Sequence, residues 1–194
     1  MTEAQAIQLI ELVKGGNANA FEKLVLHYQN MVFSFIYNMV QNQMDAEELT
    51  QDVFVKAYRK LELFRGESKF STWLFTIARN NVSSSFRKKQ LDTIDVDDSK
   101  TAHLEVDEVD NAFDVLSKKE RNETIGIALN QLAPQQKMLL QLFYLEEQSL
   151  KEIEEITGLS NGSIKTGLMR ARNNLYSVLT ERMAFKTQHD YGNW

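Results

Sequence analysis

An apolar stripe of helical period runs through residues 19–39. Its members recur at spacings of three and four residues, which places them on one face of an α-helix. Asn19 and Glu22 form an N-x-x-E signal at its start, typical of a helix N-terminus. The stripe consists of Phe21, Leu24, Val25, Tyr28, Val32, Phe35, Ile36 and Met39. No alternating strand pattern competes with it elsewhere, so we predict an all-α fold.

Three further helices are predicted in the first half of the chain. The first spans about Glu3–Lys14 and is ended by Gly15-Gly16. The next spans Asp45–Leu61, with Glu48 as capping partner of Asp45. Another runs from about Ser71 to Arg87. The chain has a single Pro, so long helices are compatible with its composition.

The second half, from about residue 118, has helical patterning again. Pro134 suits the first position of a helix. Ser149 and Glu152 form an S-x-x-E capping box for a short helix, and Gly158 provides the turn after it. A last helix follows, with Ser160 as its cap. Its buried stripe is predicted to be Ile164, Leu168, Ala171, Leu175 and Val178.

An acidic segment separates the two halves. Residues 92–116 contain nine acidic residues and one lysine, a net charge of −8, whereas the whole chain carries −5, so the remainder is +3. Weakly periodic, highly charged segments bury too little apolar surface to offset the entropy of ordering. We therefore predict two small helical bundles joined by a flexible acidic linker over 91–117, with residues 184–194 as a tail.

Several classes of protein are disfavoured. Cysteine is absent, which excludes disulfides and thiolate metal sites and fits a cytoplasmic location. The N-terminus lacks a secretory pattern, and no apolar stretch is long enough to cross a bilayer. The three histidines lack metal-ligand spacing, and no phosphate loop or nucleophile elbow is present, so we expect no enzyme activity, metal or cofactor. They are His27, His103 and His189.

An aromatic and basic turn lies before the predicted Ser71–Arg87 helix. Aromatic faces stack on unpaired bases, and nearby cations hold phosphates, so this composition suits single-stranded nucleic acid. The candidates are Phe64, Arg65, Lys69 and Phe70 in the turn, and Arg79, Asn80, Arg87 and Lys88 on the helix. Phe70 also continues the apolar stripe of that helix, which favours a core position; for Phe64 the two roles remain open.

A helix-turn-helix is predicted around Gly158. In this motif the second helix enters the major groove, and its N-terminal residues reach base edges. Ser160, Asn161, Ser163, Lys165 and Thr166 occupy that end, and Arg170 and Arg172 lie further along, where phosphates are the expected contacts. An αα-hairpin with a solvated polar face is the alternative.

The segment DAEELTQDVFVKAYRKLELFRGESKFSTWLFTIARNNVSSSFRKK, residues 45–89, resembles region 2 of the extracytoplasmic-function sigma factors of bacterial RNA polymerase. The resemblance implies docking on the β′ clamp helices of core polymerase and capture of the −10 promoter element. Residues 1–90 would form that domain, with the turn and helix named above as its DNA contacts. The implied polymerase contacts are Glu48, Leu49, Gln51, Asp52, Phe54 and Val55.

Residues 147–179 resemble region 4.2 of the same family, through S-x-x-E-I, the G-L-S turn and R-A-R at 170–172. The resemblance implies that residues 118–183 recognise the −35 element and contact the β flap. Two positions depart from the family pattern. Glu154 stands where a small residue is common, and Gly167 where an arginine is common. We expect an arginine at position 167 to add a phosphate contact.

Two other functions remain open from the sequence. The chain could be a helix-turn-helix regulator that binds duplex DNA as a dimer without sigma activity. It could also be a sigma mimic that sequesters a partner and binds no DNA. An anti-sigma factor is a further candidate partner, expected to cover Asp45–Leu61 or to lie between the domains.

Overall fold

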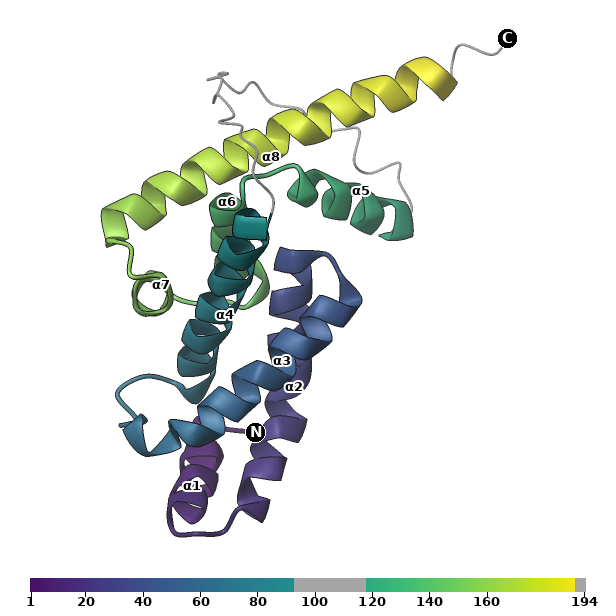
Figure 1. Cartoon of the computed structure of the whole chain (residues 1–194). Coiled ribbons are helices and arrows are strands. Elements are labelled where there is room, and N and C mark those ends of the chain that lie inside the picture. The colour runs from purple at the N-terminus through teal and green to yellow at the C-terminus, as the bar shows by residue number, and fades with distance from the viewer. Residues whose placement is uncertain (93–117, 191–194) are drawn as a thin grey trace. The chain divides into compact units, whose positions relative to one another are not determined.

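The computed structural model of the chain describes residues 1–92 and 118–190 (Figure 1). These residues are helical and contain no strand, in agreement with the predicted all-α fold. Most of the predicted linker, residues 93–117, lies outside the described residues, as do 191–194. Contacts divide the chain into two compact units. Of the described residues, the first unit contains 1–92 and 148–160, and the second contains 118–147 and 161–190.

The first unit has four long helices and one short one. They are α1 (Glu3–Lys14), α2 (Asn19–Val40), α3 (Gln43–Arg59), α4 (Phe70–Asp92) and α7 (Leu150–Thr157). α2, α3 and α4 pack against one another, α1 packs on α2, and α7 packs on α4. The predicted stripe of α2 supplies much of this core, since Leu24, Val32, Phe35 and Ile36 are fully buried. Phe75 of α4 meets Phe35, with the ring centroids 5.0 Å apart.

The helix ends confirm some predicted caps and contradict others. α1 has the predicted bounds and ends at Gly15, and Ser149 with Glu152 forms the predicted capping box of α7. The capping prediction at Asn19 was wrong, because the backbone of Ala18 is already helical and Asn19 lies inside α2. The predicted Asp45–Glu48 cap was also wrong. Asn42 caps α3, and its side chain accepts a hydrogen bond from the Asp45 N–H (3.0 Å).

The second unit contains α5 (Lys118–Asn130), α6 (Pro134–Leu140), a π-helical segment over Gln141–Leu145, and α8 (Asn161–Asp190). α8 packs on α5 and α6. Its predicted stripe is buried at Ile164, Leu168 and Ala171 and half-buried at Leu175 and Val178. α8 continues to Asp190, past residue 183 where the tail was predicted to begin. Within the described residues, no helix is long and apolar enough to cross a membrane.

Candidate nucleic-acid and protein interfaces

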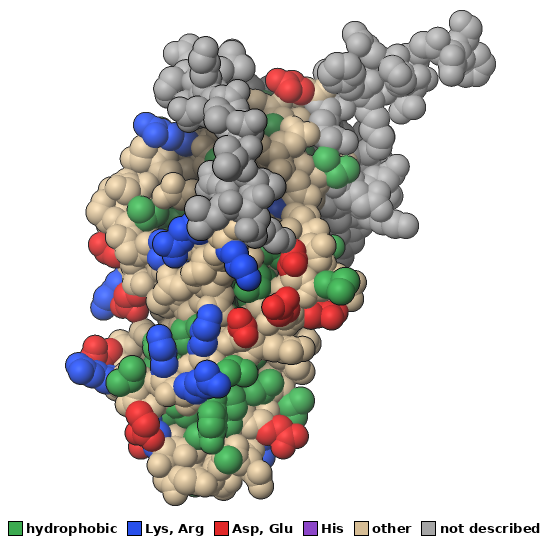
Figure 2. All heavy atoms as spheres, in the orientation of Figure 1, with side chains coloured by type: hydrophobic (Ala, Val, Ile, Leu, Met, Phe, Trp, Pro, Cys, Tyr) green, Lys and Arg blue, Asp and Glu red, His purple; other side chains and the backbone are tan. Residues whose placement is uncertain are grey.

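The exposed face of α3 is acidic in its first half. Glu48, Gln51 and Asp52 are exposed, and Leu49 is half-buried. Val55 is 46% exposed, so an apolar side chain lies on the same face as these carboxylates. Figure 2 shows acidic side chains over the N-terminal half of α3 and lysine or arginine side chains toward its C-terminal half. Five of the six residues predicted to bind polymerase therefore reach the surface.

Phe54 is the exception among these six. Its side chain is only 7% exposed, because it lies beside Val53 and Ala57 on the face of α3 that enters the core. The prediction that Phe54 contacts a partner is not supported by this position. Phe54 instead holds the helix in place through its packing.

Phe64 and Phe70 belong to an aromatic cluster in the first unit. The two ring centroids lie 5.5 Å apart at nearly a right angle, and Trp73 lies 5.4 Å from Phe64 and 5.7 Å from Phe70. Tyr28 of α2 closes the cluster, 5.4 Å from Phe70. Phe64 is 4% exposed and Phe70 is fully buried. Phe70 thus occupies the core position that its apolar stripe favoured, and Phe64 lies in the same cluster, so neither ring presents a face to solvent in this structure.

The polar candidates around α4 are exposed or half-buried. Asn80 is exposed, and its Oδ1 accepts a hydrogen bond from Arg79 (3.1 Å). Arg87 donates to Ser84 Oγ at 3.4 Å, and Arg65 is an exposed side chain that lies 4.0 Å from Glu67. These side chains could reorient toward a nucleic acid at little energetic cost, since exposed pairs contribute little to stability.

Lys88 lies apart from this group. It lines a groove of about 400 Å³ between α3 and α4, together with Asp45, Glu48 and Asp52. The structure thus brings Lys88 to the acidic face of α3. Its predicted contact with DNA stays a prediction.

Lys69 is held by α7, within the same unit. Its ammonium lies 2.8 Å from Glu152 Oε1, and a second link joins Thr72 Oγ1 to Gln148 Oε1 at 3.3 Å. Burial raises the pKa of Glu152, but hydrogen bonds from Lys69 and Ser149 outweigh burial and leave this pKa below its usual value. The hydrogen bond and charge of Glu152 in turn raise the pKa of Lys69. Both groups are therefore charged at neutral pH.

The N-terminal half of α8 presents a polar face. Ser163, Lys165, Thr166, Arg170 and Arg172 are all exposed, whereas Asn161 is half-buried. In the preceding turn Ser160 is exposed, and Gly158 adopts φ +70°, which glycine reaches without strain. All seven residues predicted to read the duplex thus remain accessible. Arg172 also donates a hydrogen bond to the hydroxyl of Tyr144 (3.3 Å).

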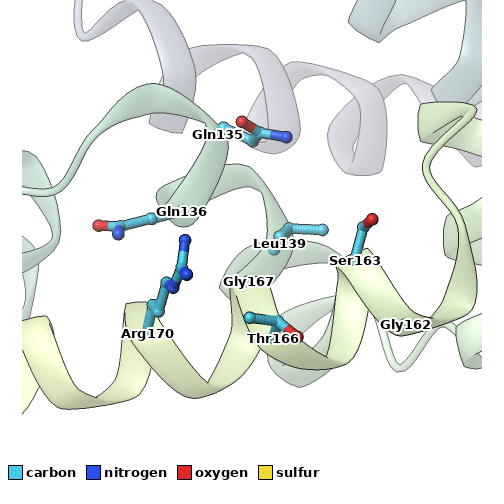
Figure 3. Close-up of a pocket in the computed structure, with 8 residues that line it drawn as sticks. All are labelled: Gln135, Gln136, Leu139, Gly162, Ser163, Thr166, Gly167 and Arg170. Atoms are coloured by element: carbon cyan, nitrogen blue, oxygen red, sulfur yellow. The ribbon is translucent and has the colours of Figure 1, made fainter.

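A pocket of about 430 Å³ lies beside this face, between α6 and α8 (Figure 3). Ser163, Thr166 and Arg170 line it from α8, and Arg170 extends toward α6. Gln135 and Gln136 line it from α6. These two glutamines were not among the sequence candidates, because only the approach of α6 to α8 brings them beside the predicted DNA contacts.

The two departures from the family pattern have different surroundings. The side chain of Glu154 in α7 is exposed. Gly167 faces α6, and a Cβ at this position would lie 2.6 Å from Leu139 Cδ1. A side chain there would have to shift the end of the Leu139 side chain. The phosphate contact expected of an arginine at 167 stays a prediction.

Among the residues that the structure describes, no three or more histidine or acidic side chains lie close enough together to bind a metal ion.

Two family models match the chain in order. They are Sigma-70 region 2, over residues 24–91, and Sigma-70 region 4, over residues 124–175. The chain is 32% identical over 178 residues to the ECF RNA polymerase sigma factor SigW of Bacillus subtilis, covering 89% of this chain and 95% of the relative. It is 30% identical over 170 residues to the ECF RNA polymerase sigma-E factor of Escherichia coli, covering 84% and 88%.

Solved structures agree with these relatives. The sigma factor RpoE of Bartonella quintana, crystallised with the anti-sigma factor NepR, is 26% identical with a TM-score of 0.64, covering 82% of this chain and 96% of that one. CnrH, solved with the cytosolic domain of CnrY, has a TM-score of 0.65 at 21% identity, over 92% and 97%, a likeness of fold alone. On the strength of the SigW match, with both family models in order, the chain belongs to the ECF RNA polymerase sigma factors.

Proposed function

We propose that this protein binds core RNA polymerase, directs it to cognate promoters in the cytoplasm, and has no catalytic centre of its own. Residues 1–90 would bind polymerase and the −10 element, residues 118–183 would bind the −35 element and the β flap, and 91–117 would link them. The observation that carries the proposal is the order of the two family matches on a chain whose exposed polar faces lie on α3, α4 and α8.

The polymerase contact is proposed on α3, at Glu48, Leu49, Gln51, Asp52 and Val55. In support, these side chains share a surface that combines carboxylates with an exposed valine. Such a surface suits a partner with a basic patch beside an apolar one, because charge complementarity sets register while apolar burial supplies affinity.

Capture of the −10 element is proposed for Arg65, Lys69, Arg79, Asn80 and Arg87. Asn80 is the candidate for reading a base edge, because its amide offers both a donor and an acceptor. The four cations would hold phosphates. Stacking by Phe64 would require the aromatic cluster to open, and the buried position of Phe70 leaves it a structural role.

Recognition of the −35 duplex is proposed for the exposed face of α8 and the turn before it. Ser160, Asn161, Ser163, Lys165 and Thr166 would reach base edges, and Arg170 with Arg172 would bind phosphates. Gln135 and Gln136 of α6 border the same face and are proposed as additional backbone contacts.

The first test is to mix the protein with bacterial core RNA polymerase and to follow it by size-exclusion chromatography. We expect co-elution, and we expect Asp52→Arg to abolish it. Glu47→Arg is the matched control, because it makes the same change of charge on the same helix at an exposed position outside the proposed contact set. Equal binding by both variants would contradict the α3 assignment.

The DNA assignment needs a separate measurement. We expect Arg170→Ala to weaken binding to a −35 duplex and to lower the slope of log K against log salt by about 1, the loss of one phosphate contact. Lys151→Ala, an exposed lysine of α7, should leave that slope unchanged. A stable dimer that shifts duplex DNA but ignores core polymerase would favour the regulator hypothesis instead.

An anti-sigma factor is proposed as a further partner, since the sigma factor RpoE of Bartonella quintana was crystallised with the anti-sigma factor NepR. We propose that it covers α3 or lies between the two functional domains. A complex with such a factor that still binds core polymerase would contradict this placement.

A further inference from the structure

The groove between α3 and α4 has two chemically different walls. The α3 wall carries the carboxylates of Glu48 and Asp52, which belong to the docking face proposed above. The α4 wall carries Asn81, Ser85 and Lys88, of which Asn81 and Ser85 have no role in that proposal. Both walls lie in the first unit, so the groove does not depend on the position of the second.

Asn81 is the most constrained polar residue of the groove. Its side chain is buried, at 5% exposure, although it lines the groove. Lys56 Nζ donates a hydrogen bond to Asn81 Oδ1 at 2.7 Å. An ammonium group can only donate hydrogen bonds, so the amide oxygen of Asn81 must face Lys56. The Nδ2 group, which is a donor, then points away from Lys56. The lysine therefore fixes the orientation of the amide, and because Nδ2 is itself buried, a docked segment reaches it only by widening the groove.

The Nδ2 group of Asn81 has no hydrogen-bond acceptor among the described residues. Buried side-chain donors are nearly always paired in folded proteins, and an exception calls for an explanation. Glu48 and Asp52, which lie across the groove, form no ion pair within the described residues either. The groove thus combines a buried donor on one wall with unpaired carboxylates on the other.

We propose that the docking surface for core polymerase extends across this groove to α4, and that Asn81 donates a hydrogen bond from Nδ2 to a carbonyl oxygen of the docked polymerase segment. The proposal rests on the proposed function. The occupant is a protein segment with a carbonyl acceptor beside a basic side chain. The carbonyl would satisfy the buried donor, and the cation would pair with Glu48 and Asp52.

The proposal assigns different partners to two adjacent asparagines. Asn80 is exposed and lies with Arg79 on the proposed DNA face, whereas Asn81 is buried toward α3. Successive residues of a helix point about 100° apart, so one element can serve both surfaces. Lys56 acts as a positioning residue, because it touches Asn81 and orients its amide.

Asn81→Asp is the decisive variant. The carboxylate keeps the shape of the side chain and its contact with Lys56, but replaces the Nδ2 donor with an acceptor. We expect affinity for core polymerase, measured by fluorescence anisotropy of the labelled protein, to fall about tenfold or more, because the partner carbonyl would face an oxygen.

Asn30→Asp is the matched control, with the same substitution at an exposed position of α2 outside the groove and outside the proposed DNA contacts, and it should bind core polymerase like the wild type. Asn81→Leu is the second variant, because it removes the donor without adding charge and should lose affinity to a similar extent. Thermal unfolding of each variant separates loss of folding from loss of docking. If Asn81→Asp does not fold, Asn81→Leu decides.

The outcomes separate this inference from the proposed function. Failure of the wild type to bind core polymerase would overturn both. If the wild type binds and folded variants at position 81 bind equally well, the inference is wrong and the proposed function stands. An equal loss in Asn30→Asp, or a wild-type homodimer that the position 81 variants dissociate without a change in polymerase affinity, would also overturn it.

Discussion

Lys69 and Glu152 form an ion pair that joins α4 to α7, with Lys69 Nζ 2.8 Å from Glu152 Oε1. The same carboxylate accepts hydrogen bonds from the backbone N–H and hydroxyl of Ser149 through its Oε2 (2.8 and 2.7 Å). Glu152 therefore caps its own helix and restrains a lysine that is proposed to hold −10 DNA. While this pair persists, Glu152 occupies one of the three donors of Lys69 and offsets its charge, which weakens the attraction of this lysine for a phosphate.

Glu152→Gln should increase affinity for a single-stranded −10 oligonucleotide. The amide keeps the capping box, since glutamine serves at this position as well as glutamate, but it no longer competes as a charge for Lys69. We expect a severalfold gain, measured by fluorescence anisotropy at constant salt. Glu155→Gln removes the same charge from an exposed site of α7 without an ion pair, and an equal gain there would indicate a nonspecific effect of net charge.

The contribution of this pair to stability should depend on pH. The pKa of Glu152 lies below its usual 4.5 and that of Lys69 above its usual 10.5. Because the pKa of Glu152 is lowered on folding, its carboxylate stabilises the folded state above about pH 4.5, and this contribution is lost as pH falls through the folded pKa. Because the pKa of Lys69 is raised on folding, its ammonium stabilises the folded state below about pH 10.5, and this contribution is lost as pH rises through the folded pKa.

Between pH 5 and 10 we expect the free energy of unfolding of the wild type to be higher than that of Glu152→Gln by less than about 1 kcal/mol. The difference is small because Lys69 is partly exposed. The difference should shrink below pH 4.5. Urea unfolding of both proteins at pH 7, 5 and 3.5 provides the measurement. A difference that stays constant down to pH 3.5 would show that the ion pair does not contribute.

Phe70→Ala should destabilise the first unit by about 3–5 kcal/mol, because it leaves a cavity in a fully buried aromatic cluster. Asn80→Ala should change stability by less than about 0.5 kcal/mol, since the side chain is exposed, yet weaken binding of the −10 oligonucleotide. Urea unfolding and anisotropy on both variants separate the two effects. A stable Phe70→Ala protein with specifically weakened DNA binding would restore the stacking hypothesis.

Gly167→Ala should stabilise the second unit less than an unhindered change of glycine to alanine in a helix. A Cβ there would meet Leu139 Cδ1 at 2.6 Å, so the Leu139 side chain must shift, and this shift offsets the helix propensity gained with alanine. Gly126→Ala in α5 has no atom within 4 Å of the new Cβ and should stabilise by up to about 1 kcal/mol. In a Leu139→Val background, the stabilisation by Gly167→Ala should increase toward that at position 126. Equal stabilisation at both glycines in the wild-type background would contradict the contact.

Local sequence predicted the helices and the overall class of this protein. The apolar stripe of α2, the capping box at Ser149 and the turn at Gly158 depend on residues within a few positions of one another, so their signals are complete in the sequence. The family resemblance added the order of the two functional regions. These features were accessible because helix geometry follows from spacing alone.

Tertiary packing decided which candidates are available. Phe54 was a candidate for contact with polymerase, and Phe64 and Phe70 were candidates for stacking on bases, with a core position favoured for Phe70. All three side chains are buried. Three contacts join residues that lie between 25 and 83 positions apart in the sequence. They are the ion pair of Lys69 with Glu152, the hydrogen bond of Lys56 to Asn81, and the close approach of Gly167 to Leu139. No local pattern encodes such pairs, because the free energy that selects them arises only when helices bury their faces against one another.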